Sequence, residues 1–216
     1  GEEQFAVQES VFTRRGITRV ASYAARLAQS RSGRLTSATK SNGIIHTMPF
    51  WDEVVRESVA GTGVTLDSEL VDALAARFVL KPESLDVVVA SNLFGDILSD
   101  LAAAVAGSIG IAPSANLNPE RVHPSLFEPV HGSAPDIAGR GIANPVAAIW
   151  AAAMMLEHLG EHAAARTLED GFTSALAHGI KTRDIGGTAD TETYTRAVLD
   201  RLTSAPSTSA PSSTPT

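Results

Sequence analysis

Hydrophobic residues return at helical spacing through much of the chain. Ile17, Val20, Ala24 and Leu27 lie three or four positions apart, so residues 16–30 are predicted to form an amphipathic helix. Further helices are predicted over residues 49–60, from a capping Asp67 to Phe78, after a capping Asn92, and over residues 145–159, 161–178 and 191–202.

Three stretches have the composition of strands. The run that follows Asp86 is uncharged and rich in valine, which is typical of a strand buried on both faces in a parallel sheet, so a strand is predicted over residues 86–91. Residues 35–41 and 5–12 are also predicted to form strands. Strands that alternate with helices indicate an α/β architecture.

Residues 107–144 are dense in Gly, Pro, Asn and Ser and are expected to lack regular structure. Connections in compact domains are typically about 4–6 residues long, so a segment of this length is expected to serve a site. The end of the chain, residues 203–216, contains only Ser, Thr, Pro and Ala and is predicted to be a disordered tail.

Composition narrows the class of protein. The 216 residues are 44% hydrophobic and 19% charged, as in globular proteins, and the net charge of −7 argues against nucleic-acid or anionic-membrane partners. The absence of cysteine excludes disulfides and thiolate metal sites. Because the longest apolar stretch is too short to span a membrane and no leader pattern opens the chain, a cytoplasmic protein is expected.

Asp96 and Asp100 are four positions apart on a predicted helix, so their carboxylates share one helix face. The helix follows the carboxyl end of a buried strand, where open α/β sheets place ligands. Hard oxygen ligands suit Mg²⁺ or Mn²⁺. The alternative is an ordinary solvated acidic face. Asp72 is a possible third ligand, although by itself it is typical of a surface aspartate.

Lys40 lies at the end of a predicted strand among small polar residues. A cation nearby would favour the neutral amine, which can act as a general base. The alternative is a solvated lysine at a strand end. His158 and His162 are interpreted as surface histidines rather than as a metal pair.

The long loop contains several glycines and leads through Asn144 into Pro145 and a helix. Glycine lets the backbone approach a ligand closely, and a helix N-terminus can face an anion. Asp136 could accept hydrogen bonds from a ribose 2′-hydroxyl and repel a 2′-phosphate. No G-x-G-x-x-G fingerprint is present, so a nucleotide site here would not be a conventional Rossmann one; an ordinary ordered loop is the alternative.

Taken together, residues 91–100, 128–139 and 142–145 resemble the β-decarboxylating dehydrogenases, which act on isopropylmalate, isocitrate, homoisocitrate, tartrate and D-malate. The resemblance extends from about Gln8 to Leu202. Within the family, residues 8–16, 36–43 and 112–121 resemble the tartrate/D-malate branch. The isopropylmalate branch typically has Asp-Lys-Ala-Asn where this chain has residues 39–42.

The resemblance implies a role for each matching residue. Asp96 and Asp100 match Mg²⁺ or Mn²⁺ ligands of one subunit of a homodimer, and Asp72 matches the metal ligand that the other subunit contributes. Lys40 matches the catalytic lysine, which the other subunit also supplies. Asn42 matches a residue near the nicotinamide of NAD. The implied adenosine-binding residues are His131, Gly132, Ser133, Ala134, Pro135, Asp136 and Asn144, and Glu128 is a further expected cofactor-binding residue. Asp136 followed by Ile137 is the NAD-type pair.

The resemblance also implies an incomplete isopropylmalate-dehydrogenase-like two-domain α/β fold. Residues 1–107 would form most of the dimerisation, metal and substrate domain, and residues 108–202 the C-terminal half of the NAD-binding domain. The family's N-terminal portion has no counterpart before Gln8, so the chain is expected to be a C-terminal fragment. The implied reaction is oxidative decarboxylation of D-malate or tartrate; 3-isopropylmalate dehydrogenase and an inactive remnant that acts as a dimerisation or binding module are the alternatives.

Overall fold

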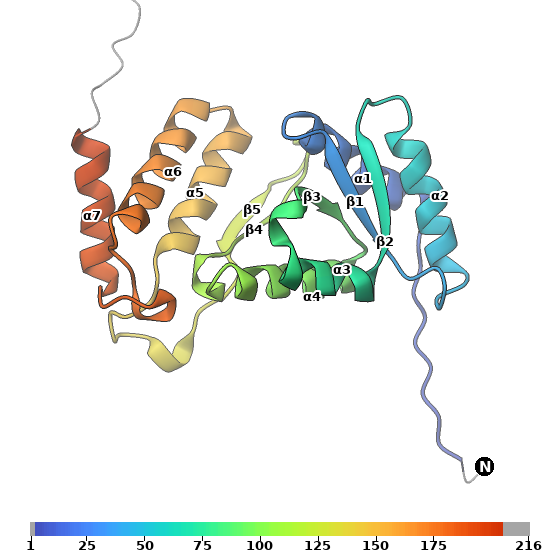
Figure 1. Cartoon of the computed structure of the whole chain (residues 1–216), viewed down its shortest axis with the longest axis horizontal. Coiled ribbons are helices and arrows are strands. Elements are labelled where there is room, and N and C mark those ends of the chain that lie inside the picture. Colours follow the sequence, from blue (N-terminus) through green and yellow to red (C-terminus); the bar gives the residue numbers. More distant parts are fainter. Residues whose placement is uncertain (1–2, 205–216) are drawn as a thin grey trace, which may run out of the picture. The chain divides into compact units, whose positions relative to one another are not determined.

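The computed structural model describes residues 3–204 and divides into two compact units, Gly1–Val105 and Ala106–Thr216. Each unit is described by itself (Figure 1). Within the described residues, no helix combines the length and apolar character needed to cross a membrane.

The first unit is built around a parallel three-stranded sheet in the order β2-β1-β3. The valine-rich run therefore does form a strand of a parallel sheet, as predicted. The elements of this unit are α1 (Arg14–Gln29), β1 (Arg34–Thr39), α2 (Thr47–Val59), β2 (Thr65–Leu70), α3 (Val71–Leu80), the 3-10 helix η1 (Pro82–Ser84), β3 (Val87–Val89) and α4 (Asn92–Val105).

Alternate side chains of the central strand β1 pack into two apolar layers, one on each face of the sheet. Leu35 packs with buried residues of α1 and α2, whereas Ala38 packs with Leu74 of α3 and Leu98 of α4. Because successive side chains of a strand point to opposite faces, α1 and α2 cover one face of the sheet and α3 and α4 the other.

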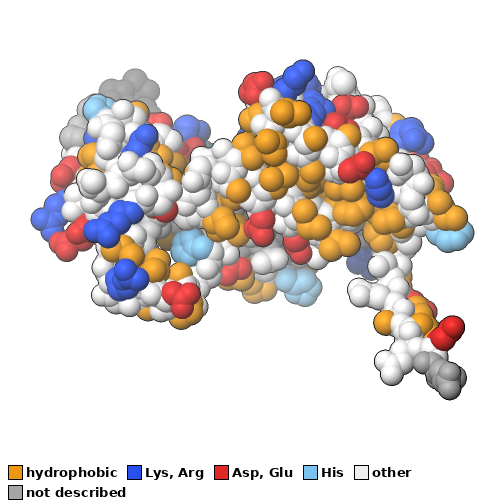
Figure 2. Space-filling model, turned by 60° about the horizontal axis from the view of Figure 1, so that its bottom comes forward, with side chains coloured by type: hydrophobic (Ala, Val, Ile, Leu, Met, Phe, Trp, Pro, Cys, Tyr) orange, Lys and Arg blue, Asp and Glu red, His pale blue; other side chains and the backbone are white. Residues whose placement is uncertain are grey.

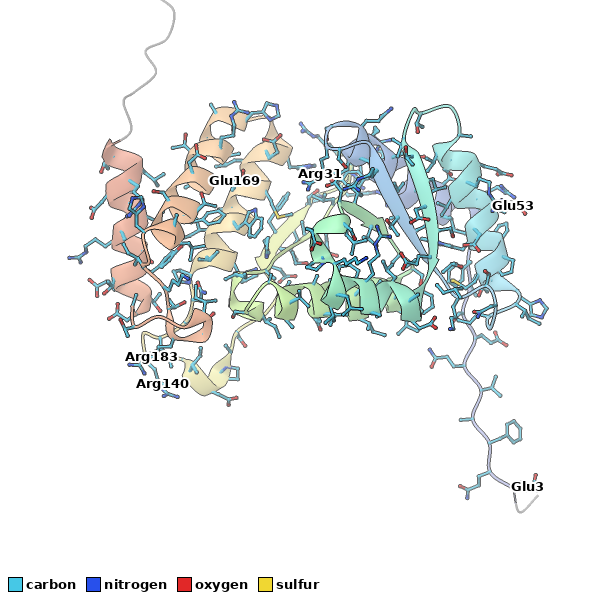
Figure 3. All side chains as sticks on the ribbon, viewed as in Figure 1. Glu3, Arg31, Glu53, Arg140, Glu169 and Arg183 are labelled. Atoms are coloured by element: carbon cyan, nitrogen blue, oxygen red, sulfur yellow. The ribbon has the colours of Figure 1, made fainter. Side chains whose placement is uncertain are left out.

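Ion pairs join α1 to neighbouring elements of the same unit. Arg14 pairs with Glu53 and Glu57 on α2. Arg31, in the turn after α1, lies 2.5 Å from a carboxylate oxygen of Asp86, directly before β3 (Arg31 and Glu53 are labelled in Figure 3).

The outer face of α3 and α4 exposes apolar side chains. Leu80 and Leu93 are 76% and 65% exposed, and Val79 and Ile97 are also more than half exposed. Figure 2 views the molecule from the side toward which these two helices lie and shows hydrophobic and acidic side chains interspersed. Large apolar side chains that are exposed together on one face can mark an interaction site.

The second unit combines a small hairpin with three helices. Strands β4 (Pro113–Asn116) and β5 (Leu126–Pro129) pair antiparallel, and the buried core of the unit includes Phe172 and Tyr194. The remaining elements are α5 (Val146–Leu159), α6 (His162–Ala177), α7 (Thr191–Ser204) and the 3-10 helices η2 (Ile109–Ile111), η3 (Pro135–Ile137) and η4 (Arg183–Ile185).

Several expectations about local structure were wrong. Residues 5–12 form no strand, and Phe5 and Val11 are more than four-fifths exposed, because no neighbouring strand among the described residues pairs with them. Asp67 lies in β2 rather than at a helix start, since its segment pairs in parallel with β1. Asn92 is the first residue of α4 rather than the cap before it.

The expected structureless segment 107–144 contains β4 and β5 as well as two 3-10 helices. The strands were not predicted because proline is disfavoured within strands. Pro113 and Pro129 lie at strand ends, where proline is tolerated. Helix α7 continues through Thr203 and Ser204, so the predicted tail does not begin at residue 203. The rest of that prediction, residues 205–216, lies outside the described residues.

Candidate active site

Asp96 and Asp100 project from α4 near the carboxyl end of β3. Both residues are exposed, and within the described chain neither carboxylate forms an ion pair with a basic side chain. The side-chain nitrogen of Asn92 donates to Asp96 Oδ2 at 3.2 Å. A cavity of about 760 Å³ opens beside Asp96 and Asn92. Two carboxylates one helical turn apart, without a cationic partner, have the donor chemistry that suits Mg²⁺ or Mn²⁺.

Lys40 and Asp72 form a second pair within the same unit. Lys40 comes two residues after Ala38, so its side chain lies on the same face of the sheet, which α3 covers. The Lys40 Nζ donates to Asp72 Oδ1 at 2.6 Å. This hydrogen bond and the charge of Lys40 hold the pKa of the Asp72 carboxyl below its usual range. The sequence distance of 32 residues gave no indication of this contact.

The two pairs remain separate within one chain. Among the residues that the structure describes, no three histidine or acidic side chains are close enough together to hold one metal ion. Asp72 therefore does not join Asp96 and Asp100 as a third ligand of the same subunit.

Asn42, in the turn after Lys40, is exposed. The backbone N–H groups of Gly43 and Ile44 both donate to the Lys40 carbonyl, at 2.9 and 2.8 Å. The turn therefore places Asn42 and Lys40 close together at the carboxyl end of β1.

The residues predicted to bind adenosine lie in the second unit, on β5 and the loop after it. Glu128 is exposed on β5, and a ring nitrogen of His131 lies 2.9 Å from the Gly132 carbonyl oxygen. Ala134 has a φ of +42°, an unusual conformation for a residue with a side chain and one that occurs at ligand sites. The loop continues into η3, where Asp136 is exposed. Gly132, Ser133 and Pro135 are exposed too.

Asn144 differs from these residues because it is only 7% exposed. Its Oδ1 accepts a hydrogen bond from the backbone N–H of Val146 at the start of α5, and its Nδ2 donates to Asp184. Both ends of the amide are thus used within the unit. The structure shows Asn144 as a residue that fixes the end of the loop.

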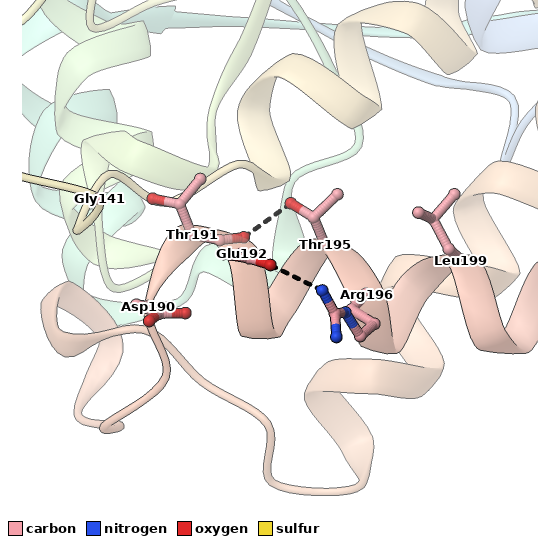
Figure 4. Close-up of a pocket in the computed structure, with 7 residues that line it drawn as sticks. All are labelled: Gly141, Asp190, Thr191, Glu192, Thr195, Arg196 and Leu199. Atoms are coloured by element: carbon pink, nitrogen blue, oxygen red, sulfur yellow. Dashed lines mark hydrogen bonds and ion pairs between the residues drawn. The ribbon is translucent and has the colours of Figure 1, made fainter. Parts of the chain in front are cut away.

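A second cavity, of about 390 Å³, lies beside the loop at Gly141 and the first turns of α7 (Figure 4). The Thr191 N–H and hydroxyl donate to the carbonyls of Gly141 and Ala143, which ties α7 to the loop. Glu192 and Arg196 form an ion pair at 2.6 Å along the cavity wall. The sequence predicted the helix but not this cavity. The signal that could have pointed to it is the i,i+4 spacing of Glu192 and Arg196.

His158 and His162 do not form a metal pair with a third ligand among the described residues. His162 Nδ1 lies 2.8 Å from a Glu157 carboxylate oxygen, and the His158 ring packs against Phe127 with their centroids 5.6 Å apart.

The sequence model of the isocitrate/isopropylmalate dehydrogenase family matches residues 1–201. The chain belongs to this family. A probable tartrate dehydrogenase/decarboxylase of Bacillus subtilis is 54% identical over 203 residues, which are 94% of this chain and 57% of that protein. The D-malate dehydrogenase [decarboxylating] of Escherichia coli is 56% identical over 205 residues, 91% of this chain and 56% of the relative.

Solved structures of the isocitrate/isopropylmalate dehydrogenase family agree with the fold. A β-decarboxylating dehydrogenase from Thermococcus kodakarensis superposes with a TM-score of 0.84 at 38% identity, over 94% of this chain and 59% of the other. An isocitrate dehydrogenase from Methylococcus capsulatus gives the same TM-score at 39% identity, over 93% and 60%. The chain thus spans little more than half the length of these relatives and holds an incomplete α/β fold of the family.

Proposed function

We propose that this chain is the C-terminal portion of an NAD-dependent, divalent-metal-assisted enzyme that oxidises and decarboxylates D-malate or tartrate. The observation that carries the proposal is the pairing of Lys40 with Asp72, beside a separate unpaired carboxylate pair on α4, in a chain more than half identical to relatives with these names. In this proposal the first unit supplies the metal and substrate domain and the second supplies half of the NAD-binding domain.

The chemistry assigns a distinct task to each pair. Asp96 and Asp100, together with Asp72 from the other subunit, would hold the cation, which when bound would stabilise negative charge that develops on the substrate hydroxyl oxygen. Lys40 would take the proton from that hydroxyl, and bound NAD⁺ would accept the hydride. Asp72 orients the Lys40 amine and balances the positive charge that it acquires. The 2-keto acid then loses its β-carboxylate as CO₂, because the ketone accepts the electron pair that the broken bond leaves.

NAD rather than NADP is the proposed cofactor. Asp136 is exposed on a loop in which Gly132 and Ala134 have positive φ angles, and this conformation is unusual for Ala134. A carboxylate there can accept hydrogen bonds from a ribose 2′-hydroxyl and would repel a 2′-phosphate. Asn42, beside Lys40, is assigned to the nicotinamide end of the cofactor.

A homodimer with shared active sites accounts for two features of the first unit. The three expected metal ligands do not gather within one described chain. The helices that carry them, α3 and α4, also expose Val79, Leu80, Leu93 and Ile97. Burying this face against a second copy would bring Lys40 and Asp72 of one subunit toward the carboxylate pair of the other.

Metal binding can be tested on the 216-residue chain itself. Titration with Mn²⁺, followed by the electron paramagnetic resonance signal of the free ion, should show binding that Asp96→Asn and Asp100→Asn each weaken by about tenfold or more. Glu83→Gln, which removes an exposed carboxylate of the same unit, is the matched control. Equal Mn²⁺ binding by all four proteins would contradict the metal assignment.

Turnover can be tested on a hybrid in which the part of the Bacillus subtilis relative that this chain does not cover is fused ahead of it. NADH formation with Mn²⁺ is expected with D-malate or tartrate in preference to 3-isopropylmalate. Lys40→Met should lower kcat by about 10²–10⁴-fold, whereas Lys81→Met, at the end of α3, should not. A Lys40→Met hybrid with undiminished kcat would exclude Lys40 as the base.

A further inference from the structure

The downstream end of the candidate cofactor loop, residues 131–144, is fixed by a carboxylate that the proposed function does not use. The Asn144 Nδ2 donates to Asp184 Oδ2 at 2.9 Å, while the Asn144 Oδ1 caps α5 through the Val146 N–H at 3.0 Å. A reversed amide would set its oxygen against the Asp184 carboxylate and its nitrogen against an N–H group. Asp184 therefore selects the one orientation of Asn144 that caps the helix.

The upstream end of the loop depends on the same carboxylate. The Ser108 hydroxyl donates to Asp184 Oδ2 at 2.6 Å and accepts from the Gly110 N–H at 2.9 Å, which caps η2. After η2, the Ala112 carbonyl accepts from the N–H of Val130, the residue directly before the loop, at 3.1 Å. Through Ser108, Asp184 thus fixes the segment that is hydrogen-bonded to the residue before the loop.

Asp184 is itself held in place. The hydroxyl of fully buried Thr182 donates to its Oδ1 at 2.6 Å. A Cβ atom at Gly110 would lie 2.8 Å from its Oδ2, so only glycine allows this approach. Burial raises the pKa of Asp184, but the hydrogen bonds from Ser108, Thr182 and Asn144 outweigh it and lower the pKa below its usual value. The carboxylate is then ionised at neutral pH and accepts from all three donors.

We propose that Asp184 is a positioning residue for nucleotide binding, which clamps both ends of loop 131–144 and so fixes the spacing of the groups that contact NAD. The inference rests on the proposed assignment of this loop to the cofactor. Asp184 touches no ligand in this scheme; it acts through Asn144 on one side and Ser108 on the other.

Hydrogen–deuterium exchange on the 216-residue chain tests the clamp without any ligand. In Asp184→Ala, the amides of Gly110, Val130 and Val146 should exchange about tenfold faster or more, while amides within α6 keep their rates. Asp184→Asn should restore most of the protection, because its one oxygen can face Ser108 and Asn144 while the Thr182 hydroxyl turns to accept from its nitrogen. Asp170→Asn, on the exposed side of α6, is the matched control.

The same substitutions are then made in the hybrid with the Bacillus subtilis part, and the hybrids are titrated with NADH, whose fluorescence reports binding. Asp184→Ala should weaken NADH binding by about tenfold and Asp184→Asn much less. Unchanged exchange at the loop ends in Asp184→Ala, or faster exchange throughout the second unit alike, would overturn the clamp. Faster exchange at both ends with unchanged NADH affinity, or no NADH binding by the unaltered hybrid, would instead overturn the assignment of the loop to NAD and leave the clamp standing.

Discussion

Asp86 shows how much a single carboxylate can contribute to the first unit. Its side chain is only 9% exposed and accepts hydrogen bonds from the Ser32 hydroxyl, the Arg31 guanidinium and the Ser32 N–H. These contacts lower its pKa from 3.8 to about 2. Because the folded state has the lower pKa, the ionised form stabilises the fold above about pH 4, and this stability is lost as the pH falls toward 2.

Asp86→Asn is therefore expected to reduce the free energy of unfolding by about 1–2 kcal/mol at pH 7, and by much less at pH 2. The measurement is urea unfolding at several pH values in a Trp150→Phe background, so that buried Trp51 reports the first unit alone. Glu83→Gln should leave the unfolding free energy nearly unchanged. A constant difference between Asp86→Asn and the parent across this pH range would refute the mechanism.

At single residues, contacts within one helix could be predicted from the sequence, whereas contacts between distant segments could not. The shared face of Asp96 and Asp100 follows from helical spacing alone, and the structure places both on α4. The Lys40–Asp72 contact depends on which face of β1 lies against α3, which spacing does not encode. Asp184 was missed because its donors Ser108 and Asn144 are 76 and 40 residues away.

At the scale of elements, α6 and α7 are joined by one buried phenol. Tyr194 is fully buried, and its hydroxyl donates to the Phe172 carbonyl at 2.9 Å. Burial raises the pKa of Tyr194 to about 12, against 10 for an exposed tyrosine. The protonated form is thus favoured by the fold, so its contribution is complete below pH 10 and is lost as the pH rises through about 12.

Tyr194→Phe should lower the stability of the second unit by about 1 kcal/mol at pH 7, since one buried hydrogen bond is lost. Between pH 10 and 12 the difference from the parent should shrink. Unfolding is followed in a Trp51→Phe background, where Trp150 packs 5.5 Å from the Phe172 ring. Tyr23→Phe, in the first unit, is the control; an effect of equal size there would show that the phenol contact is not responsible.

Elements with a strong apolar period were predicted well, and those that depend on distant partners were not. Helices α1, α5, α6 and α7 lie within a few residues of their expected bounds. Asp67 was predicted to cap a helix, but residues 65–70 pair with β1 and form a strand, and Asp67 and Glu69 form ion pairs with Arg77 of α3. Short strands such as β4 carry too few residues for a visible alternation.

At the scale of the whole molecule, the proposed function requires a second subunit to complete the site. The chain covers 57% of its Bacillus subtilis relative. Of the three candidate metal ligands, Asp72 lies on α3, whereas Asp96 and Asp100 lie on α4. In the proposed homodimer, a second copy would pack against the exposed apolar face of the same two helices and complete the site. Subunit exchange distinguishes a shared site from one contained in a single chain.

Lys40→Met and Asp100→Asn hybrids should each be inactive alone and regain about a quarter of the parent activity when unfolded and refolded together in equal amounts. Half of the resulting dimers are mixed, and each mixed dimer has one site in which both defects coincide and one that is intact. Lys40→Met mixed with Asp72→Asn is the matched control: both residues come from the same subunit, so neither site of the mixed dimer is intact and activity stays absent. Native mass spectrometry confirms that mixed dimers form. If they form and Lys40→Met with Asp100→Asn regains nothing, then each site is built within one subunit, and the exposed face of α3 and α4 must serve another purpose.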